Sequence, residues 1–226
     1  MNYNSWEVNM KIGILHSLIR PEEKLLIKEV NARSDVDLVM IDDRRVEFRL
    51  NDQSFDIDVD VVLSRCINAS RSLNAIILLD NYGIKCVNNP RTATICGDKL
   101  RTSAALGKAK LPQPDVRVAF SIESAIKAME DMGFPVVLKP AVGSWGRLLS
   151  KINDLDTAYA ILDHKETLGN YQHTIYYLQK FIEKKGRDIR VIVIGDEVVS
   201  ASYRSSEHWI TNAARGGVSQ VCKISK

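Results

Sequence analysis

Phe134-Pro135-Val136-Val137-Leu138-Lys139-Pro140 is the stretch of this 226-residue sequence on which the fold prediction turns. Its apolar run predicts a β-strand over residues 134–139, and Lys139 stands at the strand's end. An ammonium group beside apolar surroundings must either reach water or meet an anion. Taken alone, the pattern fits an edge lysine near a turn as well as a phosphate-binding lysine.

The next seven residues favour the phosphate interpretation. They read Ala-Val-Gly-Ser-Trp-Gly-Arg over 141–147 and supply two glycines, a hydroxyl and an arginine. Backbone N–H groups of such a loop can close over phosphate oxygens, and a guanidinium adds a fork of donors. The sequence lacks the GxxxxGK[ST] pattern of a Walker A loop, so the glycines alone do not define a nucleotide site. The candidate loop residues are Gly143, Ser144, Trp145, Gly146 and Arg147.

Two further segments complete a candidate nucleotide site. Lys99 begins a helix predicted over 98–108, where the helix N-terminus favours anions. A solvated surface lysine is the alternative interpretation of Lys99. Residues 178–190 read as a strand, a hinge and a second strand that begins at Asp188. Backbone groups of a hinge can pair with adenine, and a carboxylate a few residues later can accept both ribose hydroxyls.

The pattern before residue 90 predicts a separate α/β domain. Short apolar runs alternate with helical patterns, which favours a mostly parallel sheet whose ligands bind beyond the carboxyl ends of the strands. We therefore expect residues 16–20 and 65–71 to lie near a ligand. The strands expected here are 12–15, 36–41, 61–63 and 84–87, the helices are 22–30 and 70–81, and 46–60 could form a hairpin.

The second half of the chain is expected to mix strands and helices. A stiff Leu-Pro-Gln-Pro connector over 111–114 follows the helix at 98–108. The expected strands are 116–119, 134–139, 148–152, 174–181, 188–194 and 197–204, and the expected helices are 121–132 and 154–168.

Composition limits the function classes. Hydrophobic residues make up 45% of the chain and charged residues 26%, with a net charge of +3. A nucleic-acid-binding protein usually carries a concentrated basic stripe, which is missing here, while the mild positive charge favours anionic partners. No apolar run reaches the roughly 20 residues of a membrane helix, and the start lacks a signal peptide's pattern. The four cysteines have no metal-ligand spacing, so we expect reduced thiols, no metal ligands and a cytoplasmic location.

The order of strand lysine, glycine loop, hinge and acidic residue resembles the ATP-grasp superfamily in its RimK-like branch. The likeness is greatest to the LysX and ArgX ligases, which attach α-aminoadipate or glutamate to the acidic carrier protein LysW. It rests on Cys96–Lys99, Leu111–Pro114, Pro135–Arg147, Gly186–Arg190 and His208–Gly217, and it spans residues 10–226.

The resemblance implies roles for individual residues. Lys99 and Lys139 are expected to bind phosphates, the loop 143–147 to close over ATP, and Asp188 to accept the ribose. The implied adenine contacts are Gln179, Lys180, Phe181 and Ile182. The implied catalytic residues are Arg190, Arg204 and Arg215. The implied substrate-binding residues are Arg65, Ser70, Arg71, Arg204, Asn212 and Arg215.

The resemblance also implies a reaction and a domain plan. ATP phosphorylates the C-terminal glutamate of LysW, and the amino group of α-aminoadipate or glutamate attacks the acyl phosphate, in lysine or arginine biosynthesis. Mg²⁺ is the implied metal, although its usual ligands are expected beyond residue 226, so we expect the 226-residue chain to form no product alone. The expected plan is a disordered leader (1–9), a parallel α/β domain (10–90), a central ATP-grasp subdomain (91–185) and a truncated C-terminal subdomain (186–226). A homo-oligomer is implied.

Two alternatives remain open from the sequence. One is a RimK-type enzyme that adds glutamate to another protein or to a cofactor. The other is a truncated nucleotide-binding module without turnover.

Overall fold

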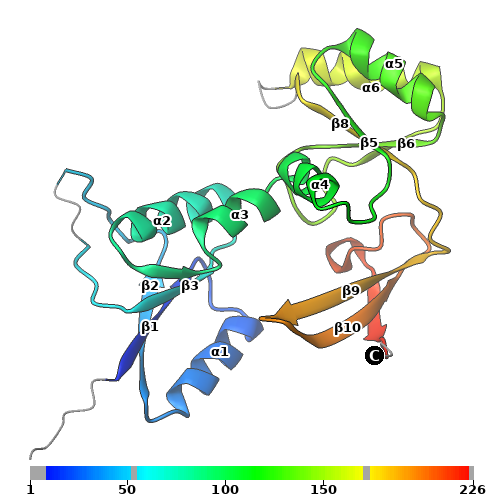
Figure 1. Cartoon of the computed structure of the whole chain (residues 1–226). Coiled ribbons are helices and arrows are strands. Elements are labelled where there is room, and N and C mark those ends of the chain that lie inside the picture. The colour runs from blue at the N-terminus through cyan, green and yellow to red at the C-terminus, as the bar shows by residue number, and fades with distance from the viewer. Residues whose placement is uncertain (1–8, 52–54, 170–173, 224–226) are drawn as a thin grey trace, which may run out of the picture. The chain divides into compact units, whose positions relative to one another are not determined.

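A computed structural model describes residues 9–51, 55–169 and 174–223. The expected leader, apart from Asn9, lies outside these residues. The chain forms two compact units, residues 1–97 and 98–226, and each is described by itself (Figure 1). The expected domain boundary at residue 90 stays a prediction.

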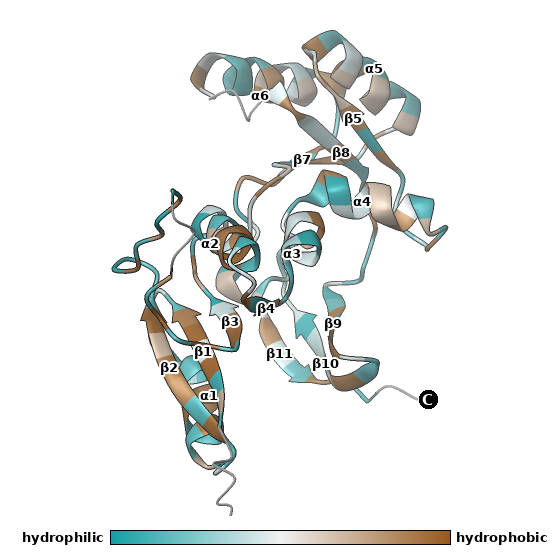
Figure 2. Ribbon diagram, turned by 60° about the vertical axis from the view of Figure 1, so that its left-hand side comes forward, coloured by the Kyte–Doolittle hydropathy of each residue, from teal (hydrophilic) through white to brown (hydrophobic). Residues whose placement is uncertain are grey.

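The first unit is built on a four-stranded parallel sheet in the order β2-β1-β3-β4. Every neighbouring pair in this sheet is parallel, which confirms the predicted α/β class. Its strands are β1 (Met10–His16), β2 (Val36–Asp42), β3 (Val61–Arg65) and β4 (Lys85–Val87). Its helices are α1 (Pro21–Asn31), α2 (Ala69–Asn81) and α3 (Pro90–Cys96). Brown stretches along β1 and β2 mark their apolar residues in Figure 2, and Leu15, Val62 and Leu79 are fully buried between sheet and helices.

Local chemistry sets the helix boundaries in this unit. Pro21 occupies the first position of α1, where a missing N–H costs no helical hydrogen bond. Asn68 caps α2 by accepting from the N–H of Arg71 at 2.9 Å. In the described part of residues 46–60 no strand forms, although Arg49 makes an isolated β-bridge, and Phe48 and Phe55 stack at 5.4 Å. Its residues 52–54 lie outside the described chain.

The second unit begins with helix α4 (Lys99–Lys108) and a four-stranded antiparallel sheet in the order β5-β8-β6-β7. Its strands are β5 (Val116–Ala119), β8 (Tyr176–Lys180), β6 (Val136–Lys139) and β7 (Ser150–Ile152). Helices α5 (Ile122–Met132) and α6 (Leu155–Leu168) lie together in Figure 1 and bury Met129 and Leu162 against the sheet. Ser121 and Asp154 cap the two helices, which begin one residue after the starts expected from the sequence.

A second antiparallel sheet follows, in the order β11-β10-β9. It consists of β9 (Arg187–Ile194), β10 (Glu197–Ser205) and β11 (Val218–Val221), with a 3-10 turn, η2 (Ala213–Arg215), before the last strand. Strands β9 and β10 occupy nearly the predicted positions. The sequence pattern did not predict β11 or helix α3.

Candidate nucleotide-binding site

Lys139 and Gln179 meet on one face of the first sheet of unit 2. Strands β6 and β8 pair Val137 with Gln179, so Lys139 is a diagonal neighbour of Gln179. The Lys139 ammonium donates to Oε1 of Gln179 at 2.7 Å. Burial, together with the positive charges of Lys99 and Lys184, lowers the pKa of Lys139 to about 8. The sheet thus holds a half-desolvated ammonium group that an anionic ligand would stabilise.

Lys99 comes from a different element but lines the same hollow as Lys139. Its ammonium donates to the carbonyl oxygen of Gly143 at 2.8 Å, and its backbone N–H donates to Ala141 at 2.9 Å. Burial lowers the pKa of Lys99 below the ordinary value. Helix α4 therefore places its first residue against the base of the glycine loop.

The glycine loop needs its glycines. Gly143 has φ 150° and Gly146 has φ 67°, values that disfavour other residues. A Cβ atom at Gly146 would come within 2.9 Å of Cγ2 of Ile210, so the loop approaches the segment before η2 very closely. Within the loop, the Arg147 guanidinium lies 4.8 Å from the ring centroid of Trp145.

Two adjoining hollows carry most of the predicted residues. The first has a volume of about 240 Å³ and contains both lysines and the loop. The second has a volume of about 230 Å³ and lies along the hinge. The first is lined by Lys99, Lys139, Gly143, Ser144, Trp145, Gly146, Arg147, Leu149 and Asn212. The second is lined by Val137, Lys139, Leu149, Gln179, Phe181, Ile182, Lys184, Asp188, Trp209, Ile210 and Asn212. Because three residues line both, one elongated ligand can occupy the two together.

One aromatic residue of the hinge and one from the segment before η2 supply walls to the second hollow. Phe181 and Trp209 contact edge to face, with centroids 6.3 Å apart. The Lys180 ammonium points elsewhere, since it donates to the carbonyls of Met132 and Gly133 at the end of α5 at 2.8 and 2.6 Å. The backbone N–H of Lys180 donates to the carbonyl of Asp115 at 2.9 Å, so the predicted adenine contact would have to use the backbone carbonyl of Lys180.

Asp188 is the acidic end of the same hollow. Arg204 donates to it twice, from Nε to Oδ1 at 2.7 Å and from Nη2 to Oδ2 at 2.8 Å. Thr211 donates to Oδ2 at 2.6 Å, and the Lys184 ammonium lies 3.6 Å from Oδ2. Burial by itself raises the pKa of Asp188, but these donors and charges outweigh it and hold the pKa below its usual value. Asp188 is thus an ionised, well-ordered acceptor.

The three predicted arginines lie in different surroundings. Arg204 is paired with Asp188, whereas Arg190 is exposed on β9 and lines neither hollow. Arg215 is exposed in η2, and its Cγ atom lies 3.4 Å from the position a Cβ of Gly146 would take. Their predicted roles with substrate stay predictions.

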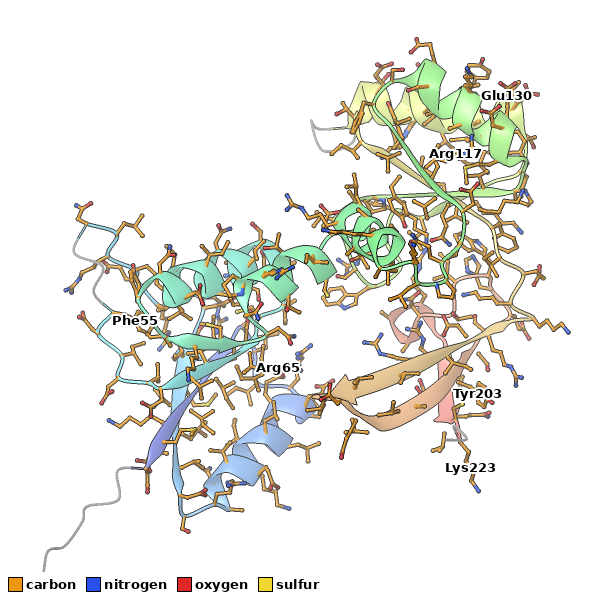
Figure 3. All side chains as sticks on the ribbon, viewed as in Figure 1. Phe55, Arg65, Arg117, Glu130, Tyr203 and Lys223 are labelled. Atoms are coloured by element: carbon orange, nitrogen blue, oxygen red, sulfur yellow. The ribbon has the colours of Figure 1, made fainter. Side chains whose placement is uncertain are left out.

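The residues predicted in unit 1 gather at the carboxyl ends of its strands. Arg65 donates to the fully buried Glu23, which Arg20 also contacts (Arg65 is labelled in Figure 3). Hydrogen bonds from Arg20 first, and from Arg65, lower the pKa of Glu23 to about 2. Arg71 lies 3.7 Å from Asp43, and Ser70 is exposed at the start of α2. Whether Arg65, Ser70 and Arg71 bind substrate is a proposal.

Sequence reasoning missed several lining residues. Lys184 and Trp209 lie inside the quoted hinge and His208–Gly217 segments, but their residue types gave no separate signal. Val137, Leu149 and Ile210 look like ordinary core residues in the sequence. Thr211 is fully buried, and its contact with Asp188 depends on tertiary folding.

The described residues do not fit a magnesium ion. Mg²⁺ prefers carboxylates and water in octahedral geometry. No group of three or more His, Cys, Asp or Glu side chains suitable for a metal occurs in the described ranges. The one carboxylate lining the two hollows, Asp188, is already engaged by Arg204 and Thr211.

Two larger hollows lie elsewhere on unit 2. One, of about 710 Å³, is lined by residues of the turn before β9 and by the ends of β10 and β11. The other, of about 460 Å³, lies between α6 and strands β6 and β7. Neither contains a residue predicted for the site.

Comparisons with known proteins identify the class. Residues 12–95 match the LysX preATP-grasp domain, and residues 96–226 match the RimK-like ATP-grasp domain. The chain therefore belongs to the RimK-like ATP-grasp family, whose similar curated members are ligases. The predicted fold class is confirmed.

Particular relatives narrow the likeness. The chain is 35% identical to the glutamate–LysW ligase ArgX of Sulfolobus acidocaldarius over 211 residues, which is 92% of this chain and 73% of that protein. It is 35% identical to the α-aminoadipate–LysW ligase LysX of Saccharolobus solfataricus over 206 residues, 91% of this chain and 74% of that one. A tetrahydromethanopterin:α-L-glutamate ligase of Methanococcus maripaludis is 29% identical over 88% of this chain and 72% of its own length.

Solved structures agree on the fold. A RimK-domain ATP-grasp protein of Sphaerobacter thermophilus superposes with a TM-score of 0.76 at 28% identity, covering 86% of this chain and 73% of that one. A D-alanine–D-alanine ligase of Bacillus anthracis, solved with ATP, gives 0.64 at 18% identity over 96% of this chain and 72% of that one, which supports the fold alone. In the described part of the chain, no helix has the length and apolar character needed to cross a membrane.

Proposed function

We propose that this chain is an ATP-dependent carboxylate–amine ligase that joins α-aminoadipate or glutamate to the C-terminal glutamate of a LysW-type carrier. The observation that carries the proposal is that Lys99, Lys139 and the loop 143–147 line one hollow. This hollow adjoins a second one, which is lined by Phe181 and Trp209. The ArgX and LysX relatives supply the substrate class.

The nucleotide would lie along the two hollows. Phe181, Ile182 and Trp209 offer apolar walls for adenine, and Gln179 lies beside them. Lys99 and Lys139 come from separate elements, so they can contact different phosphate oxygens at once. Backbone N–H groups of the glycine loop, with Ser144 and Arg147, would cover the same phosphates.

The reaction would proceed in two displacements. An oxygen of the carrier carboxylate attacks the γ-phosphorus of ATP, and ADP leaves. The amino nitrogen then attacks the acyl carbon and loses a proton, while phosphate leaves as the amide forms. The positive groups of this chain stabilise the charge on the transferring phosphoryl group, and this electrostatic contribution dominates phosphoryl transfer.

Exposed arginines form the amino-acid end of the proposed site. A bidentate guanidinium suits a substrate carboxylate, and Arg190 and Arg215 are exposed arginines in the second unit. Arg65, Ser70 and Arg71 are the corresponding candidates in unit 1. A role in lysine or arginine biosynthesis, a cytoplasmic location and a homo-oligomer complete the proposal.

Mass spectrometry of the carrier tests this function. A LysW-type carrier is incubated with ATP, Mg²⁺ and either amino acid, together with the 226-residue chain or the longest protein that its gene encodes. We expect the carrier to gain one aminoadipyl or glutamyl residue in at least one arm. No gain in any arm would contradict the proposal, and a gain on tetrahydromethanopterin in its place would favour the RimK-type alternative, which the relative at 29% identity suggests.

A further inference from the structure

We infer that Arg204 is a positioning residue for the ribose contact, and that it leaves Asp188 able to accept one ribose hydroxyl rather than two. The inference rests on the proposed nucleotide site and deepens it. It departs from the substrate role that the sequence predicts for Arg204.

The backbone fixes this pair. Strands β9 and β10 are antiparallel, and their register sets Arg204 directly opposite Asp188. Side chains directly opposite each other share one face of a sheet. The guanidinium then meets the carboxylate as a fork at 2.7 and 2.8 Å, with only 16% of the Arg204 side chain exposed. A guanidinium held this way already uses two parallel donors on Asp188, so it is poorly placed to bind a second anion.

Counting acceptor sites gives the number of hydroxyls. An ionised carboxylate offers about four lone-pair directions, two on each oxygen. Oδ2 receives Arg204 Nη2 and Thr211 Oγ1, which fills it. Among the described residues, Oδ1 receives a hydrogen bond from Arg204 Nε alone. One lone pair of Oδ1 is therefore left, enough for a single hydroxyl donor.

The surroundings hold this arrangement. Thr211 is fully buried, and it also accepts from the Lys184 ammonium at 2.8 Å. Lys184, Asp188 and Ile210 line the hollow assigned to the nucleoside, so Asp188 belongs to the proposed nucleotide site and not to a separate one. Arg204 itself is not among the lining residues.

Deoxynucleotides test the inference on the full chain. Dissociation constants are measured by calorimetry for ATP, 2′-deoxy-ATP and 3′-deoxy-ATP. We expect one of the two deoxy forms to bind about tenfold more weakly than ATP, as for loss of a hydrogen bond to a charged acceptor, and the other to bind like ATP. Equal losses for both forms, or no loss for either, would overturn the single-hydroxyl assignment.

Variants separate positioning from direct contact. In Arg204→Gln, we expect ATP affinity to fall about tenfold. The deoxy-ATP that binds the wild-type chain more weakly than ATP should keep its wild-type affinity, so that the variant binds it and ATP equally well. Asp188→Asn should do the same, and the double variant should lose nothing more. Arg204→Lys keeps the positive charge but loses the two parallel hydrogen bonds, so its ATP affinity should stay close to that of Arg204→Gln.

A different pattern would contradict the positioning role. If Arg204 touched phosphate or substrate directly, Arg204→Gln would weaken all three nucleotides equally and preserve the discrimination. Arg117→Gln is the matched control, because Arg117 lies on β5, pairs with Asp131 of α5 and lines neither hollow (Arg117 is labelled in Figure 3). Failure of the wild-type chain to bind any nucleotide would instead contradict the proposed function itself.

Discussion

The ammonium of Lys139 on β6 reaches the neighbouring strand β8, where it donates to Oε1 of Gln179 at 2.7 Å. It does so half-desolvated, with Lys99 and Lys184 near enough to depress its pKa. A cationic cluster of this kind is destabilised when empty and stabilised by a polyanion. The Lys139–Gln179 pair therefore marks a part of unit 2 that is suited to bind a triphosphate.

Replacing Lys139 with Ala tests this directly. We expect nucleotide binding to weaken by about 1.5–3 kcal/mol, the usual range for a charge-assisted hydrogen bond. Calorimetry with ATP on the folded variant gives the number, and Lys127→Ala, at an exposed position on α5, serves as the control. Unchanged affinity in the Lys139 variant would remove this residue from the phosphate site.

Binding should take up a proton near pH 8. The pKa of Lys139 is about 8 in the free chain, and an anionic ligand raises it because it favours the charged form. At pH 8 part of the population must therefore gain a proton on binding, whereas at pH 6.5 the ammonium is already charged. Titrations in buffers of different ionisation enthalpy should show proton uptake at pH 8 and little at pH 6.5. Equal uptake at both values would show that another group titrates.

Gly146→Ala should weaken ATP binding more than its left-handed backbone conformation alone explains. Gly83 is the matched control, since its φ of 81° is also left-handed but a Cβ there meets nothing within 4 Å. Each variant should lose about 1 kcal/mol of stability from the backbone. Only Gly146→Ala introduces a contact, at 2.9 Å from Ile210, so only it should weaken ATP binding. Equal ATP affinities for the two variants would show that the loop does not cover the nucleotide.

Much of this could be predicted from the sequence, for identifiable reasons. Helices α5 and α6 begin within one residue of the expected starts, because capping by Ser121 and Asp154 acts locally. Lys139 and the glycine loop stood out because their residue types are unusual at the end of an apolar strand, and Lys99 because it begins a helix. The sequence did not predict the partners of Asp188. Arg204 and Thr211 lie 16 and 23 residues away in sequence and meet Asp188 only after β9 and β10 pair.

Unit 1 offers a test that is independent of the nucleotide site. Glu23 is fully buried, and its pKa is lowered from 4.5 to about 2 by hydrogen bonds from Arg20 and Arg65. A depressed carboxyl pKa adds stability that is present above about pH 4.5 and is lost as pH falls towards 2. Glu23→Gln should therefore cost about 2 kcal/mol at pH 7 and progressively less below pH 4. Urea unfolding measures this, with the exposed neighbour Glu22→Gln as control; a cost that does not change with pH would mean that packing, not charge, stabilises this contact.

The mass of the carrier protein after reaction tests the central claim most directly. A LysW-type carrier ending in glutamate is incubated with ATP, Mg²⁺ and α-aminoadipate or glutamate, using the 226-residue chain, the longest protein of its gene, and the Lys139→Ala form of each. We predict a gain of one amino-acid residue that requires ATP and that Lys139→Ala strongly reduces. A carrier whose mass is unchanged in every arm, or a gain that survives without ATP, would contradict the assignment of this chain as an ATP-dependent carboxylate–amine ligase.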